Sequence, residues 1–197
     1  TGMVIITVTS IIAQFGINQS IIQVDSLTDT YLTTAQILSL LISMLAFSLI
    51  SISAPSIAVF FHEPMLAKIL SILAMIIPLQ STYLIPQSLL NRDFHFRKLA
   101  ITELFSFTIG RIVIPVYLAA QGYGIWALAI SFVMAEILTA SILLIINRQK
   151  FKAPINGNDV KKILSSGGGF TLARMGNIIA LQGDYFIISK TLGVVSL

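Results

Sequence analysis

Cysteine is absent from the 197 residues, and histidine occurs only twice. Without cysteine the chain can form no disulfide bond, thiolate metal site or cysteine nucleophile. His62 and His95 each stand alone, with no second ligand at helical spacing, so neither predicts a metal site. No nucleophile has a base beside it at the spacing of a catalytic motif. We therefore expect neither an enzyme nor a bound cofactor.

Charged residues are also scarce, at 10% of the chain, whereas soluble domains average about 25%. Hydrophobic residues make up 56%, and the mean hydropathy is +0.92. Several nearly uncharged runs reach the roughly 20 residues that a helix needs to cross about 30 Å of hydrocarbon. These features predict an integral membrane protein.

The apolar runs and the gaps between them predict an all-α, polytopic membrane helix bundle. About six transmembrane helices fit the chain at the length that a bilayer requires. We expect them at residues 3–23, 27–57, 66–90, 97–120, 124–146 and 160–192. Because the chain has no initiating Met and stops just after a helical pattern, we interpret it as an internal fragment of a longer protein.

Two helix starts carry capping signals. Ser26 and Asp29 have the spacing of a capping box, which predicts that the second helix begins near Leu27. Asp159 is the expected N-cap of the last helix.

Proline and glycine predict two further local features. Pro78 and Pro86 fall inside the third helix, where each removes a backbone hydrogen bond, so this helix should be kinked. The run of three glycines at 167–169 lacks the Lys and Ser/Thr of a phosphate-binding loop. It favours a close-packing surface or a flexible start of the last helix.

The net charge of +4 is distributed as a topology signal and does not indicate nucleic-acid binding. Basic residues gather in the gaps 90–98 and 147–162, which should therefore be cytoplasmic. The gap 24–31 should share that side, although it has Asp25 and Asp29 and no basic residue. The basic residues of the cytoplasmic gaps are Arg92, Arg97, Lys98, Arg148, Lys150, Lys152, Lys161 and Lys162, against Lys68 on the opposite side.

Ionisable side chains inside the apolar runs are the candidates for a functional site. Each costs about 2.5–3.5 kcal/mol at a bilayer centre on insertion scales, so such groups usually face a bundle interior or a water-filled cavity. The candidates are Glu103, Arg111, Glu136, Arg174 and Asp184, with Asn177 and Gln182 nearby.

Structural alternatives remain open for these charges. Glu103 either lies near the membrane interface or faces a cavity. Arg111 either forms a structural ion pair with Glu136 on the adjacent helix or faces a cavity. Arg174, one turn from Asn177 on a face that also has glycine, favours a cavity.

Four stretches together resemble a known family. They are FFHEP (60–64), LLNRDFHFRKLAITE (89–103), GYGIWALA (122–129) and GDYFIISKTLG (183–193). In order and spacing they resemble the Wzx-type lipid-linked oligosaccharide flippases, a branch of the multidrug/oligosaccharidyl-lipid/polysaccharide exporter superfamily. Gly169-Phe-Thr replaces the small-x-Pro opening of that family's seventh helix.

The resemblance implies a two-lobed transporter of twelve or more helices around a central cavity. Residues 1–157 would form the second to sixth helices, in the N-terminal lobe. Residues 158–197 would form the first helix of the second lobe, truncated.

The resemblance also implies a function. Such a protein would flip an undecaprenyl-diphosphate-linked repeat unit across the bacterial inner membrane by alternating access. Guanidinium groups bind phosphate oxygens in a bidentate manner, so Arg111 and Arg174, with Asn177, would bind the diphosphate or sugar in the cavity. Glu136, Asp184 or Glu103 would couple transport to protons or sodium. The implied partners are the lipid-linked oligosaccharide, the bilayer, and a polysaccharide polymerase with its chain-length machinery.

Two other functions remain open. A multidrug exporter of the same superfamily would favour carboxylates and aromatic rings for cationic drugs. A non-transporting scaffold of a polysaccharide assembly complex would pair its buried charges with one another and leave no hydrated path.

Overall fold

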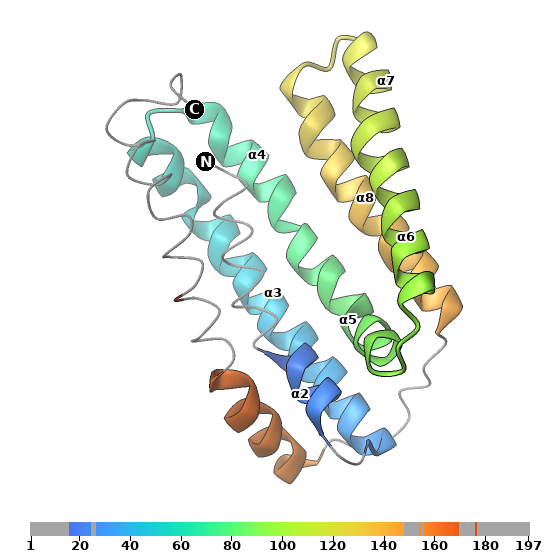
Figure 1. The fold of residues 1–197 in the computed structure, drawn as a ribbon. Helices are drawn as coiled ribbons and strands as arrows, with labels where there is room; N and C mark the ends of the chain where they lie inside the picture. Colours follow the sequence, from blue (N-terminus) through green and yellow to red (C-terminus); the bar gives the residue numbers. More distant parts are fainter. Residues whose placement is uncertain (1–15, 25–26, 148–153, 155, 170–175, 177–197) are drawn as a thin grey trace.

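The computed structural model describes residues 16–24, 27–147, 154, 156–169 and 176, and all regular structure among them is helical (Figure 1). The predicted all-α class is confirmed. The helices are α2 (Ile17–Gln23), α3 (Asp29–Phe60), α4 (Pro64–Ala74), α5 (Ile76–Arg92), α6 (Phe96–Thr108), the π-helical segment η1 (Ile109–Val113), α7 (Ile114–Ala120) and α8 (Ile125–Ile146). Residues 157–169 are also helical.

Four helical stretches in the described part are long and apolar enough to cross a membrane. They correspond to the predicted helices at 27–57, 66–90, 97–120 and 124–146. The predicted helices at 3–23 and 160–192 extend beyond the described residues, which include only parts of them. The four stretches are Asp29–Phe60, Pro64–Arg92, Phe96–Ala120 and Ile125–Ile146.

The stretches run antiparallel, so their connections alternate between two ends of the bundle (Figure 1). The α5–α6 turn and the helical residues 157–169 lie at one end, and the α3–α4 and α7–α8 turns lie at the other. Arg92, Arg97 and Lys98 are therefore at the opposite end from Lys68. This arrangement agrees with the predicted sidedness, and the assignment of the basic end to the cytoplasm stays a prediction.

Both predicted helix caps are wrong by two or three residues. Helix α3 begins at Asp29, and its N-cap is Thr28, whose side chain accepts a hydrogen bond from Tyr31 N at 3.2 Å. The predicted cap Ser26 lies outside the described residues. The last helix begins at residue 157, and Asn156 Oδ1 accepts from Asn158 N at 3.1 Å. Asp159 is thus inside the first helical turn, where a carboxylate still complements the helix dipole.

The helical stretch Pro64–Arg92 is interrupted near Pro78. Met75 separates α4 from α5, one turn before Pro78. Pro78 has no N–H to donate to the carbonyl four residues earlier, and this explains a break at that position. Pro86 lies within the uninterrupted helix α5.

Two of the clusters of buried side chains in the described part of the chain join most of its helices. One joins α3, α4, α5 and α8 through residues such as Ile50, Leu70 and Ile77. The other joins α2, α3 and α5 to Ile163 of the last helix. In the same region a Cβ atom on Gly16 would lie 2.4 Å from Gly167 O, so the close packing predicted for the glycine run is confirmed at Gly167.

Candidate functional site

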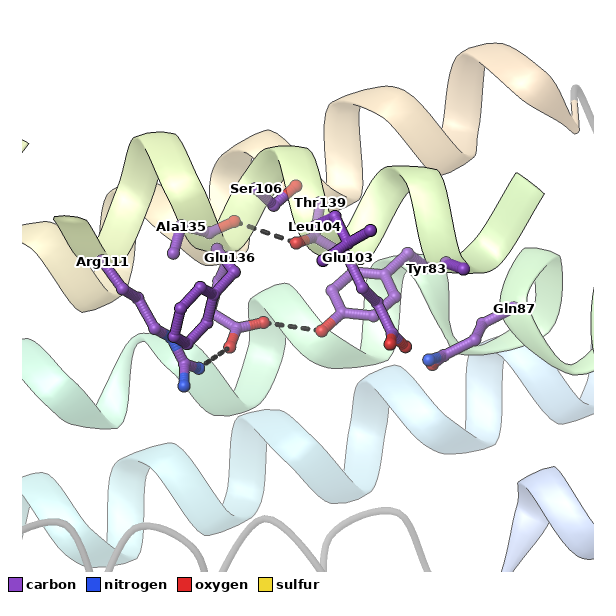
Figure 2. Close-up of a pocket in the computed structure, with 11 residues that line it drawn as sticks. Tyr83, Gln87, Glu103, Leu104, Ser106, Arg111, Ala135, Glu136 and Thr139 are labelled. Atoms are coloured by element: carbon purple, nitrogen blue, oxygen red, sulfur yellow. Dashed lines mark hydrogen bonds and ion pairs between the residues drawn. The ribbon is translucent and has the colours of Figure 1, made fainter. Parts of the chain in front are cut away.

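A cavity of about 710 Å³ lies between α5, α6, η1 and α8, within three of the membrane-spanning stretches. Its wall combines carboxylates, one guanidinium group, amide and hydroxyl groups, and aromatic rings. The lining residues are Tyr83, Gln87, Ala100, Glu103, Leu104, Ser106, Phe107, Arg111, Ala135, Glu136 and Thr139. Figure 2 shows their side chains.

Arg111 and Glu136 meet in this cavity as an ion pair. Arg111 Nη2 lies 3.7 Å from Glu136 Oε1, and the two side chains are 41% and 10% exposed. The guanidinium carbon also lies 5.1 Å from the ring centre of Phe132 and 5.9 Å from that of Phe107, within cation–π range. The separation of 3.7 Å exceeds the 2.7–2.9 Å of a charge-assisted hydrogen bond, so the pair is loose and, within the described residues, the guanidinium keeps donors for a further partner.

Local backbone structure sets the position of Arg111. The residue lies in the middle of η1, where hydrogen bonds span one residue more than in an α-helix. Pro115 follows four residues later, and because it lacks an N–H the carbonyl of Arg111 has no α-helical donor. Gly110 packs directly on α8, because a Cβ atom there would lie 2.4 Å from the Cβ of Ala135. Arg111 and Glu136 are thereby brought to facing positions.

Glu136 is buried and has two further partners on α5. Tyr83 Oη donates a hydrogen bond of 2.6 Å to Oε2, and Gln80 Nε2 donates one of 3.5 Å to Oε1. Figure 2 shows the carboxylate between the Tyr83 hydroxyl and the Arg111 guanidinium. A buried carboxylate is tolerated only with such compensation, so three elements are linked through one side chain.

Glu103 lines the same cavity from α6, and its depth relative to the membrane interface stays a prediction. Among the described residues it has no ion-pair partner. The cavity wall therefore has two carboxylates and one guanidinium group. The described wall thus has one more acidic than basic side chain.

Three predicted site residues, Arg174, Asn177 and Asp184, lie outside the described residues. The structure therefore brings together Arg111, Glu136 and Glu103 only. Sequence reasoning missed Tyr83 and Gln80, the partners of Glu136. Both are visible in the sequence as polar side chains between Pro78 and Pro86, but Ser81 and Thr82 lie between them, so the sequence does not single out the two that meet Glu136.

A second polar layer lies between α3 and α5. Gln36 Nε2 donates to Ser81 O at 3.0 Å, and Ser43 Oγ donates to Ser81 Oγ at 2.9 Å. All three side chains are buried and uncharged. We call these residues the hydroxyl seam.

Comparison with known proteins identifies the family. The family described as "Polysaccharide biosynthesis protein" matches residues 1–197, the whole chain. The chain belongs to this family. The resemblance to polysaccharide exporters inferred from the sequence motifs is confirmed at this level, and the four spanning helices make this member of the polysaccharide biosynthesis protein family a multi-pass membrane protein.

Two curated relatives are similar to this family member. The succinoglycan biosynthesis transport protein ExoT of Rhizobium meliloti (strain 1021) is 30% identical over 151 residues, which cover 77% of this chain and 30% of the relative. The teichuronic acid biosynthesis protein TuaB of Bacillus subtilis (strain 168) is 29% identical over 195 residues, covering 95% of this chain and 39% of the relative. The chain thus spans about a third of the length of these relatives. No solved structure matches it significantly.

Proposed function

We propose that this chain is part of a transporter that flips a lipid-linked oligosaccharide, carried on a polyprenyl diphosphate, across the bacterial cytoplasmic membrane. The observation that carries the proposal is the half-exposed guanidinium of Arg111 inside a membrane-spanning stretch, at the wall of a polar cavity. Such a charge costs free energy in lipid unless water, a partner or a substrate meets it. Membership of a polysaccharide biosynthesis family and the names of the two relatives support this direction.

In this proposal Arg111 binds the diphosphate with donors that its loose contact to Glu136 leaves free. The described wall has more acidic than basic side chains, because Glu103 and Glu136 face only one arginine, Arg111. A diphosphate therefore requires a second cation, and Arg174, with Asn177 beside it in the sequence, would supply it from the second lobe. Both arginines should be needed for transport, and lysine should replace either only in part because it lacks the bidentate fork.

The carboxylates would couple transport to an ion. Glu136 contacts Tyr83, Gln80 and Arg111. A change in its charge would therefore weaken its contacts to both α5 and η1. Glu103 lines the same cavity, and Asp184 is a candidate in the second lobe. The implied partners stay the lipid-linked oligosaccharide, the bilayer, and the polymerase and chain-length machinery.

Two observations favour other functions. The excess of carboxylates beside Phe107 and Tyr83 suits a cationic drug, which keeps the multidrug exporter as an alternative. The Arg111–Glu136 pair is also what a non-transporting scaffold would contain. These alternatives make different predictions for the same variants.

The test uses Arg111→Gln, Glu136→Gln and the double variant in the full-length protein, with Lys68→Gln as a control at the far end of the bundle. If Arg111 binds diphosphate, Arg111→Gln and the double variant should both abolish polysaccharide export while the double variant keeps normal membrane abundance. Lys68→Gln should leave export unchanged. Export restored in the double variant would show that the arginine is structural. If the parent protein gives resistance to cationic drugs and no polysaccharide export, the multidrug exporter is favoured.

A further inference from the structure

The turn between α5 and α6 has an unusual residue at its bend. Phe94 has φ of +56°, in the left-handed region that a bulky side chain rarely adopts. Its N–H donates to Asn91 O at 3.2 Å, and His95 N donates to Leu90 O at 2.9 Å, which is the pattern of a Schellman motif. Glycine is the usual residue at this position because it has no Cβ penalty. Phenylalanine here costs free energy of folding.

The α7–α8 turn shows the same motif with the expected residue. Gly122 has φ of +86°, its N–H donates to Ala119 O at 3.0 Å, and Tyr123 N donates to Leu118 O at 3.2 Å. The backbone geometry alone therefore does not require an aromatic residue. The α3–α4 turn has the same motif with His62 at φ of +57°, so what distinguishes Phe94 is its exposed aromatic ring.

The ring of Phe94 adds little to the packing of the described bundle. It is 78% exposed, and its ring centre lies 5.8 Å from that of Phe96, which is 55% exposed, in an edge-to-face arrangement. The two neighbouring exposed rings form an apolar surface at this end of the bundle.

The position and charge of the turn indicate what covers these rings. Phe94 falls between two membrane-spanning stretches, which end at Arg92 and begin again at Phe96, so it lies at the level of the lipid head groups. Arg97 and Lys98 are exposed beside it, and Asp93 is the only acidic residue in the turn. Arg92 points back into the protein, where its Nη1 donates to Ile21 O at 2.7 Å.

We propose that the α5–α6 turn is a docking surface for anionic phospholipids. The rings of Phe94 and Phe96 insert among the lipids, and Arg97 and Lys98 bind the phosphates of their head groups. Basic side chains at this level attract anionic lipids, and aromatic rings anchor protein at the membrane interface. This inference is independent of the proposed transport activity, since it concerns the end of the bundle and not the cavity.

Fluorescence quenching by brominated lipids tests the proposal in the full-length protein. Phe94→Trp and the matched control Tyr123→Trp are placed in nanodiscs of equal parts phosphatidylglycerol and phosphatidylcholine, with bromine on the acyl chains of one lipid at a time. The parent protein supplies the background signal. The tryptophan at position 94 should be quenched at least about two-fold more by brominated phosphatidylglycerol, because the basic residues enrich that lipid locally. The tryptophan at position 123 should be quenched equally by both lipids.

Two further variants separate anchoring from lipid choice. Arg97→Gln with Lys98→Gln should abolish the preference for phosphatidylglycerol while quenching at position 94 persists. Phe94→Gly suits the left-handed conformation and should fold normally, but it should lose the rise in melting temperature that phosphatidylglycerol gives the parent protein. Absence of quenching at position 94 would mean that another protein segment or water covers the ring. That result, or equal quenching by both lipids, would overturn the proposal.

Discussion

Helix α5 lies between two polar layers that are built in opposite ways. Toward α3 it presents Ser81, which takes part in the neutral hydroxyl seam. Toward α8 it presents Tyr83, which donates to a carboxylate that also meets a guanidinium group. The two residues are only two positions apart in the sequence, yet one layer is fully buried and the other opens into a cavity.

The difference lies in where the hydrogen bonds are satisfied. Ser81 Oγ donates to Pro78 O at 2.7 Å, and the one proton of Ser43 Oγ is shared between Leu40 O and Ser81 Oγ, both at 2.9 Å, so each hydroxyl has an acceptor on its own helix. Small hydroxyls of this kind permit close helix packing in a membrane. Glu136 and Arg111 have no such local partner and depend on side chains from other helices. The first layer is uncharged and packs α3 on α5, whereas the second places charged side chains within membrane-spanning stretches, where each costs free energy unless a partner or water compensates it.

The largest effect is expected when the close contact between η1 and α8 is broken, because this contact places Arg111 opposite Glu136. Gly110→Val would place Cβ about 2.4 Å from the Cβ of Ala135, so η1 must move away from α8. Overpacking of this kind costs about 1–3 kcal/mol, and the displacement should also separate Arg111 from Glu136. We expect a fall in both the melting temperature of the purified full-length protein and its membrane abundance. Gly157→Ala, with no atom within 4 Å of the added Cβ, is the control and should change neither. Normal stability of Gly110→Val would contradict the close contact.

A smaller effect is expected when the hydroxyl group of Tyr83, which binds the Glu136 carboxylate, is removed. Tyr83→Phe keeps the ring but removes the hydroxyl that donates to Glu136 at 2.6 Å. Loss of a buried donor to a charged acceptor costs about 1–3 kcal/mol. Thermal unfolding of the purified protein should show this loss, and export should fall because Glu136 is no longer held in place. The matched change Tyr117→Phe, at a residue 62% exposed on α7, should leave both unchanged. Equal melting temperatures for the two variants would remove Tyr83 from the site.

The smallest effect is expected in the hydroxyl seam. Ser81→Ala removes one hydroxyl, but Ser43 keeps its bond to Leu40 O and Gln36 keeps its bond to the backbone of residue 81. The loss should be below about 1 kcal/mol in thermal unfolding, with export unchanged. Loss of export in this variant would show that the two layers are not functionally distinct.

Much of the fold could be predicted from the sequence because hydrophobicity and length decide it. The helices at 66–90, 97–120 and 124–146 end within a few residues of the predicted positions, since QGYG and the charged turn at 92–97 interrupt the apolar runs. The caps were less predictable. Thr28 and Ser26 offer the same hydroxyl, and Asn156 and Asp159 both suit an N-cap, so residue type alone does not decide where each helix begins.

The site was predictable only in part, for a related reason. A charge inside an apolar run is visible in the sequence, and Arg111, Glu136 and Glu103 were found in this way. Their pairing depends on Gly110 lying against Ala135 and on a π-helical segment, which no hydrophobic pattern encodes. Tyr83 was missed because a tyrosine in an apolar helix looks the same whether its hydroxyl meets a carboxylate or the lipid interface.

The π-helical segment also fixes the rotational phase between two halves of one membrane span. It absorbs one residue more than an α-helix would, so the faces of α6 and α7 stay aligned across it. The same residues wound as a continuous α-helix would turn α7 by about 100° relative to α6, which moves its protein-facing side by more than a quarter turn toward the lipid. A chain of this family without the bulge can keep both faces only by being one residue shorter. We therefore expect single-residue gaps in alignments of the family to fall between Glu103 and Pro115.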